Sequence, residues 1–259
     1  QAALQAEGLA YTVAASATNF TAAPAPGISL TDMDVILVAS RRVEHAERTR
    51  TTQHTASGDL VGWMLEDLRQ KLGKVGKLEL LDGFGEKIDA YYGALGGASA
   101  ALTSDDLRRW AEATEVLAEV ARDSGDLVEA EARSARTLAL RGQVVASAPG
   151  DADDLAALGL SHKFHAEVQV DLGATRDALA SFASAEAAYV AAIAATPERA
   201  NRHLDLAVML AKRGEFEADG ADRAAAPDTF GRAMAALDAA MARASADATF
   251  DEERATVLL

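Results

Sequence analysis

GATRDALASFASAEAAYVAAIAATP spans residues 173–197 and decides the fold, because an earlier part of the chain has the same plan. That part is GDLVEAEARSARTLALRGQVVASAP, residues 125–149, which also runs from a glycine to a proline over the same separation. Each segment is alanine-rich, has apolar residues at three- and four-residue spacing and contains no internal proline. This spacing predicts one helix per segment, since glycine commonly ends a helix and proline commonly opens the next.

A second helix-length stretch precedes each glycine, at residues 107–124 and 154–172. A third stretch, RANRHLDLAVMLAKR, leads to Gly214, where we expect a third turn. The predicted unit is therefore helix, tight turn, helix and loop, and its recurrence is typical of a solenoid.

Small residues recur at fixed distances from these glycines. Ala118, Ala166 and Ala207 each lie seven positions before a glycine, and Ala130 and Ala178 each lie five positions after one. We expect these alanines to be buried where the two helices of a pair approach closely.

This arrangement resembles the tetratricopeptide repeat (TPR) family, in which small residues, a turn glycine and an aromatic residue recur in a fixed order. The second repeat matches the pattern at Ala166, Gly173, Ala178, Phe182 and Ala185. The first repeat departs from it at two places, with Ser134 and Thr137 where the aromatic residue and the second alanine belong. The third departs by an insertion near EADGADR, residues 217–223, after which Ala226, Phe230 and Ala233 resume the pattern.

The resemblance extends to residues 60–95, which are similar to the segment before the repeats in large bacterial TPR proteins, many of them membrane-anchored. LSHKFHAEV, residues 160–168, also resembles their repeat openings. The fold class implied is all-α, a TPR-like helical-hairpin solenoid with a less regular N-terminal arm. We expect the arm at 1–55, a helical lead-in at 56–102, and hairpins at about 103–148, 151–196 and 198–245 within a repeat region that continues to a tail ending at 259.

Composition narrows the classes of partner. The net charge of −15 and the pI near 4.7 disfavour nucleic acid and anionic lipid as partners. The chain has no cysteine, which excludes thiolate metal sites and disulfides. No run approaches the roughly 20 apolar residues that a membrane span needs, so we expect no span in this chain. An extracytoplasmic, periplasmic location is favoured over a cytoplasmic one by the family's frequent membrane attachment and by a first residue that is not Met.

His162 and His165 lie three residues apart with Glu167 nearby, a combination that can bind zinc or iron. The opposing interpretation is stronger, because His203 occupies the position of His162 one repeat later, and a repeated position indicates packing. Gly83 and Gly85 lack a phosphate-loop pattern, and no nucleophile has an assignable base. We therefore expect no cofactor and no enzymatic activity. Trp63, Trp110, Tyr91 and Tyr92 are interpreted as packing residues.

The remaining functional surface is the groove that the first helices of a TPR array form. The family's phasing implies that this face carries Glu112, Glu115, Glu119, Lys163, Glu167, Asn201 and Lys212. The first three form an acidic stripe at helical spacing, which favours a basic or polar partner segment unless the stripe is only solvated surface.

The function indicated is protein–protein interaction, as an accessory or scaffold subunit of a larger, membrane-associated bacterial assembly. The alternative is a sensory or regulatory region of a membrane-bound signalling protein whose effector domain lies elsewhere. The sequence shown ends in an apolar triplet, Val257, Leu258 and Leu259. We expect this triplet to contact either a partner or a further helix.

Overall fold

The computed structural model describes residues 82–97 and 102–244, and this part of the chain contains helices and no strand. The protein is therefore all-α over the described residues. The N-terminal arm, most of the lead-in with Trp63, and the tail with Val257, Leu258 and Leu259 lie outside them. The elements are α3 (Asp82–Gly97), α4 (Ser104–Asp123), α5 (Leu127–Ser147), α6 (Ala152–Asp171), α7 (Thr175–Ala195), α8 (Ala200–Phe216), the π-helical turn η3 (Glu217–Ala221) and α9 (Ala226–Ala244).

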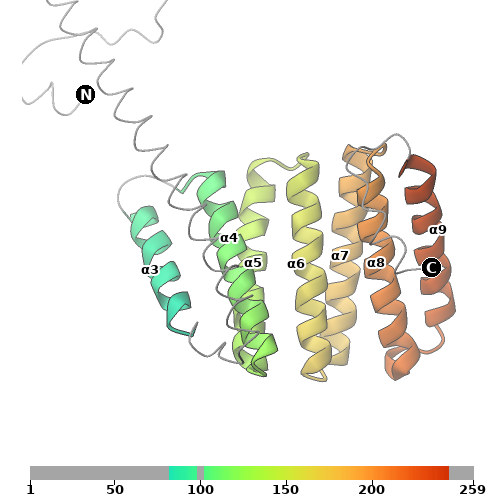
Figure 1. Ribbon diagram of the computed structural model, residues 1–259, viewed down its shortest axis with the longest axis horizontal. Helices are drawn as coiled ribbons and strands as arrows, with labels where there is room; N and C mark the ends of the chain where they lie inside the picture. Colours follow the sequence, from blue (N-terminus) through green and yellow to red (C-terminus); the bar gives the residue numbers. More distant parts are fainter. Residues whose placement is uncertain (1–81, 98–101, 245–259) are drawn as a thin grey trace, which may run out of the picture. The chain divides into compact units, whose positions relative to one another are not determined.

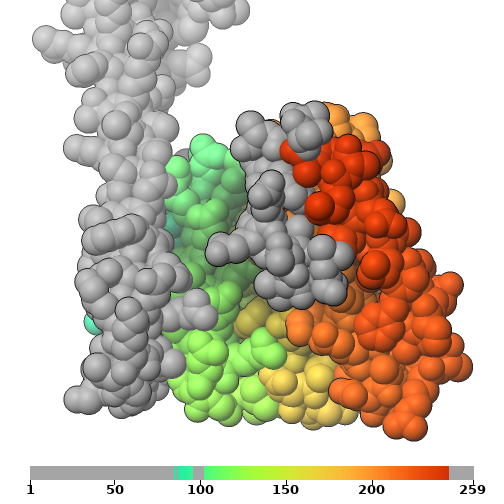
Figure 2. All heavy atoms as spheres, turned by 45° about the vertical axis from the view of Figure 1, so that its right-hand side comes forward, coloured from blue at the N-terminus to red at the C-terminus, as the bar shows by residue number. Residues whose placement is uncertain are grey.

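The helices pack in chain order, each against the next, and the most extensive contacts join α4 to α5, α6 to α7 and α8 to α9 (Figure 1). The members of a pair are antiparallel: Ser104 at the start of α4 shares a 3.0 Å hydrogen bond with Ser147 at the end of α5. In the space-filling view, α8 and α9 (orange and red) lie next to α6 and α7 (yellow) (Figure 2).

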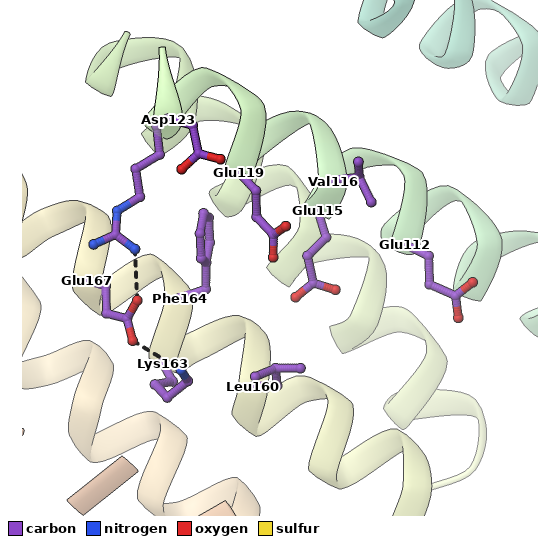
Figure 3. Close-up of a pocket in the computed structure, with 10 residues that line it drawn as sticks. Glu112, Glu115, Val116, Glu119, Asp123, Leu160, Lys163, Phe164 and Glu167 are labelled. Atoms are coloured by element: carbon purple, nitrogen blue, oxygen red, sulfur yellow. Dashed lines mark hydrogen bonds and ion pairs between the residues drawn. The ribbon is translucent and has the colours of Figure 1, made fainter. Parts of the chain in front are cut away.

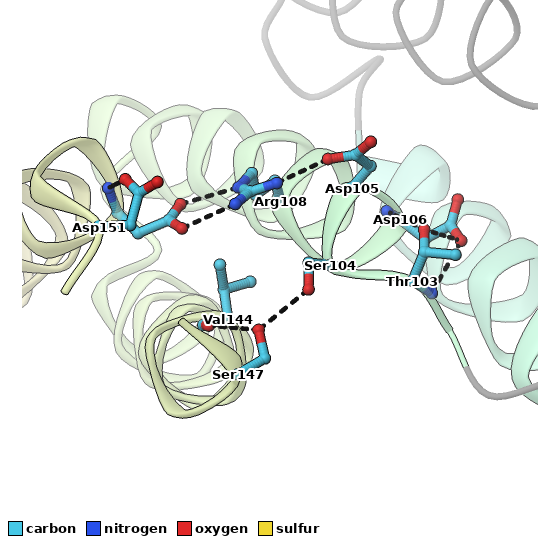
Figure 4. A network of polar contacts seen from close by, with 9 residues as sticks. Thr103, Ser104, Asp105, Asp106, Arg108, Val144, Ser147 and Asp151 are labelled. Atoms are coloured by element: carbon cyan, nitrogen blue, oxygen red, sulfur yellow. Dashed lines mark hydrogen bonds and ion pairs between the residues drawn. The ribbon is translucent and has the colours of Figure 1, made fainter. Parts of the chain in front are cut away.

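The first two turns form as the sequence predicts. Gly125 and Gly173 have φ angles of 83° and 73°, in the left-handed region where glycine carries no Cβ penalty. Helix α4 begins with a capping box, in which the Thr103 side chain accepts from the Asp106 amide and the Asp106 carboxylate accepts from the Thr103 amide (Figure 4). This cap provides hydrogen-bond acceptors for the backbone amides of Thr103 and Asp106, which have no partner within the helix.

The predicted alanines are buried. Ala118, Ala166, Ala130 and Ala178 are 0% exposed and Ala207 is 1% exposed. Because side chains this small let helix axes approach, the alanine positions fix how each helix is rotated toward its partner.

The aromatic residues before the first pair contribute to the core where α3 meets α4. Tyr92 and Trp110 are buried and stack with ring centroids 5.4 Å apart, and Trp110 Nε1 donates to Asp89 at 2.8 Å. Burial raises the pKa of Tyr92 to about 12. Tyr91 is more than one-third exposed and packs edge-on to Tyr92, so the packing interpretation holds for it only in part.

Gly214 does not form the third turn, contrary to the sequence prediction. It lies within α8, where an added Cβ would come within 2.9 Å of the Phe230 ring. The chain turns instead at Gly220, with a φ of 127°, inside η3. Helix α8 thus continues past Gly214 to Phe216, the insertion at residues 217–223 contains the turn, and Gly214 serves close packing.

Helix α7, Thr175–Ala195, is long and apolar enough by composition to span a membrane, although polar and charged residues interrupt it. The expected absence of a membrane span stays a prediction. One face of α7, which includes Phe182, Ala185 and Tyr189, is buried against neighbouring helices. Core helices of soluble proteins pass the same test, so the apolarity of α7 is also that of a packed helix.

The first helices of successive pairs are joined by ion pairs. Arg108 of α4, labelled in Figure 4, donates from Nε and Nη2 to the two carboxylate oxygens of Asp154 of α6, each at 2.8 Å. Asp154 is only 5% exposed. These hydrogen bonds raise the pKa of Arg108 above its usual range. Arg202 of α8 pairs with the exposed Asp153 of α6 through Nη2 alone.

We predict that Ala166→Leu destabilises the protein by about 1–3 kcal/mol, because no space exists for the added carbons beside Phe182 and Ala185. Urea unfolding followed by circular dichroism measures the effect. Ala183→Leu, at an exposed position of α7, is the matched control and should stay within about 0.5 kcal/mol of the parent. Equal stability of the two variants would show that the alanine does not set the helix spacing.

Candidate protein-binding groove

A hollow of about 540 Å³ lies between α4 and α6, and we call it the first hollow (Figure 3). Its α4 side is a line of carboxylates separated by helical turns, and its α6 side adds apolar, aromatic and charged groups. The lining residues are Glu112, Glu115, Val116, Glu119, Arg122, Asp123, Leu160, Lys163, Phe164 and Glu167. Five of the seven predicted site residues are therefore brought together here.

The three glutamates of the predicted stripe differ in their surroundings. Glu112 is exposed, whereas Glu115 is held beneath the surface. Glu115 Oε2 accepts from Arg141 Nη2 of α5 and Oε1 accepts from Ser161 Oγ of α6, both at 3.0 Å. Glu115 thus joins three helices, and Glu112 is the exposed member of the three.

The α6 side of the first hollow combines an apolar surface with a charged end. Leu160 is 46% exposed, and the Phe164 ring lies 5.7 Å from the guanidinium of Arg122. Glu167 accepts from Arg122 at 2.8 Å and from Lys163 at 3.0 Å. Both cations are therefore paired. The lining holds five carboxylates and only these two cations, so acidic groups predominate in the first hollow.

A second hollow of about 250 Å³ adjoins the first and shares Arg122 and Glu167 with it. Lys212 lines this second hollow and donates to Glu215 at 2.9 Å. Asn201 lines neither hollow. The predicted set thus divides into five residues at the first hollow, Lys212 at the second, and Asn201 apart from both.

Sequence reasoning missed the residues that close the groove. Arg122 lies one helical turn after Glu119, and its hydrogen bonds to Asp171 (2.6 Å) and Glu167 raise its pKa even though burial opposes its charge. Phe164 lies between His162 and His165 in the sequence and was not predicted to line the groove. Helical spacing from the glutamates would have identified Arg122, but no pattern in the sequence pairs it with α6.

His165 takes part in a polar network that crosses α5, α6 and α7. Gln169 Nε2 donates to His165 Nε2 at 3.0 Å, so the neutral ring carries its proton on Nδ1 and donates to Ser134 Oγ at 2.7 Å. Ser134 Oγ donates to the Glu131 carbonyl, and Ser181 Oγ donates to Gln169 Oε1. Ser134, at the position where the TPR pattern has an aromatic residue, thus fills that position with a hydrogen-bonded polar group.

Both ring nitrogens of His165 are engaged in this network, and Glu167 pairs with cations and with neither histidine. His203 is buried and its Nε2 lies 3.1 Å from the Pro197 carbonyl oxygen. Among residues 82–97 and 102–244, no group of three or more His, Asp or Glu side chains is arranged to hold a metal ion.

Burial lowers the pKa of His162 and of His165. For His165 this effect outweighs the negative charges of Glu131 and Asp177, which favour the protonated ring.

We predict that Glu115→Ala destabilises the protein by about 1–3 kcal/mol, because Arg141 and Ser161 lose their shared acceptor inside the helix array. Glu112→Ala, one turn away on the exposed surface, should cost no more than about 0.5 kcal/mol. Urea unfolding of the two variants compares them. A loss at Glu112 as large as that at Glu115 would contradict the role given to Glu115.

The histidines give stability a dependence on pH. Since their pKa values are lower in the folded protein than the usual 6.5, the unfolded chain binds protons more readily, and stability falls as pH drops below about 6.5. We predict that a His162→Gln/His165→Gln variant loses less stability than the parent between about pH 7.5 and pH 5.5. Urea unfolding at both pH values measures this, and equal losses in the two proteins would refute it.

Comparisons of the chain with models of protein families, with characterised proteins and with solved structures give no match. They neither support nor oppose the TPR resemblance. Function is therefore inferred from the residues that form the two hollows.

Proposed function

We propose that this protein is a TPR-like helical solenoid that acts as a protein–protein interaction module, an accessory or scaffold subunit of a larger assembly. The first hollow is the observation that carries the proposal. It is long in one direction, along α4, and combines apolar contact area with charged walls, which suits a peptide segment or a helix of a partner. No reaction is assigned to it, and the protein functions by binding.

The TPR-like arrangement is supported by the recurrence of the same contacts from pair to pair. Buried alanines occupy equivalent positions in α4, α6 and α8. The ion pairs of Arg108 with Asp154 and of Arg202 with Asp153 connect successive first helices. Stacking first helices side by side generates an extended binding surface, as in other repeat proteins.

The chemistry of the first hollow favours a basic partner segment with at least one apolar anchor. Glu112, Glu119 and Asp123 present carboxylates along one wall, while Leu160 and Phe164 offer apolar contact beside them. An acidic partner would meet the same charge on this wall, and the net charge of −15 adds to that repulsion at a distance.

The test begins with selection of binding peptides from a displayed random library, followed by calorimetry of a synthetic peptide that is selected. We predict that the peptide is basic and that Glu112→Lys/Glu119→Lys weakens its binding by about tenfold or more. Added salt should also weaken binding, since screening reduces the attraction. Circular dichroism and thermal melting establish that the variant is folded.

The matched control is Glu198→Lys/Asp238→Lys, which alters the net charge equally at exposed positions outside both hollows. It should retain most of the affinity. Equal weakening by both double variants would show that binding depends only on overall charge. If no selected peptide responds to Glu112→Lys/Glu119→Lys, the proposal is overturned.

A further inference from the structure

The inserted turn η3 is held in place by a buried carboxylate. Glu217 is 0% exposed, its Oε1 accepts from Arg213 Nε of α8 and its Oε2 accepts from Thr229 Oγ1 of α9, both at 2.6 Å. Arg213 also contacts Glu186 of α7 at 3.3 Å. A buried carboxylate is stable only with such partners, so these bonds fix the insertion between α8 and α9.

The anchored turn brings a carboxylate to the groove. Asp219, two residues after Glu217, lines the second hollow together with Glu215 and Phe216 at the end of α8. Asp219 is exposed, and within the described part of the chain no hydrogen bond or ion pair engages its carboxylate. Asp219 is the one residue of the inserted segment, 217–223, that lines this hollow.

The second hollow has an apolar side and an acidic rim. Val170, Phe182 and Phe216 supply the apolar side, and the rings of the two phenylalanines lie 6.2 Å apart. Asp171, Glu215 and Asp219 supply carboxylates at the rim.

Two of these carboxylates are already paired. Asp171 is bound to Arg122, and Glu215 is bound to Lys212. Asp219 therefore supplies the negative charge that is not balanced by a neighbouring cation. A lysine or arginine side chain matches this site, because its aliphatic stem packs on apolar surface while its head stays among carboxylates.

We propose that the insertion creates a second anchoring site, which takes one Lys or Arg side chain of the same basic segment that binds the first hollow. This inference rests on the proposed function, since it concerns the same partner. The two hollows share Arg122 and Glu167, so one continuous segment passes from α4 across α6 to α8 and η3. The insertion thus selects partners that carry a second basic residue beyond the one held at the first hollow.

The experiment uses the full chain and the selected synthetic peptide, with each basic residue of the peptide replaced in turn by glutamine. We expect Asp219→Lys to weaken binding of the parent peptide by about tenfold. Asp222→Lys is the matched control, because it makes the same charge change in the same insertion at a residue that does not line the hollow. Asp219→Asn and Asp222→Asn repeat the comparison with a smaller change.

One glutamine-substituted peptide should be insensitive to Asp219→Lys while remaining sensitive to Glu112→Lys/Glu119→Lys, which identifies the side chain held at the second hollow. If only the Glu112/Glu119 variant weakens binding, the second anchoring site is wrong and the proposed function stands. If Asp219→Lys and Asp222→Lys weaken binding equally, the effect is general charge and the site is also wrong. If neither hollow responds, the proposed function itself fails.

Discussion

Close approach of the helices at buried alanines is the constraint on which the rest of the structure depends. Ala118 and Ala166 have no exposed surface and Ala207 almost none, so a larger side chain at any of them would push two helices apart. Each alanine fixes the rotation of its helix, and the rotation determines which residues face the groove. Glu112 and Glu119 on α4, and Leu160 and Phe164 on α6, line the first hollow as a consequence of that rotation.

Charged residues then join helices that alanine packing alone would leave free to slide. Arg108 with Asp154 and Arg122 with Glu167 and Asp171 tie α4 to α6, and Glu115 adds α5 through Arg141. Several of these side chains also line the hollows, so structural and ligand-facing charges are close neighbours. The difference between them is their partners: a carboxylate held by two other helices maintains the fold, whereas one such as Asp219 is available to a ligand.

Features that depend on local chemistry could be predicted from the sequence, and features that depend on distant partners could not. The turns at Gly125 and Gly173 and the burial of the alanines follow from residue type and spacing. The prediction of a turn at Gly214 is wrong because the sequence does not distinguish a turn glycine from one that packs beneath an aromatic ring. The ring is that of Phe230, which follows the insertion and could not be paired with Gly214 from the sequence. The role of Glu115 in joining helices could not be predicted, because its partners Arg141 and Ser161 approach it from other helices.

The central claim is that the groove between α4 and α6 is where this protein binds its partner. A photo-crosslinking amino acid at position 160, inside the first hollow, tests it directly when compared with one at position 128, where Val128 is 74% exposed on α5 and away from both hollows. In extracts of the native source, followed by mass spectrometry, the account predicts one protein captured from position 160 and not from 128, through a basic segment. Capture from 128 alone, or the same proteins from both positions, would contradict it.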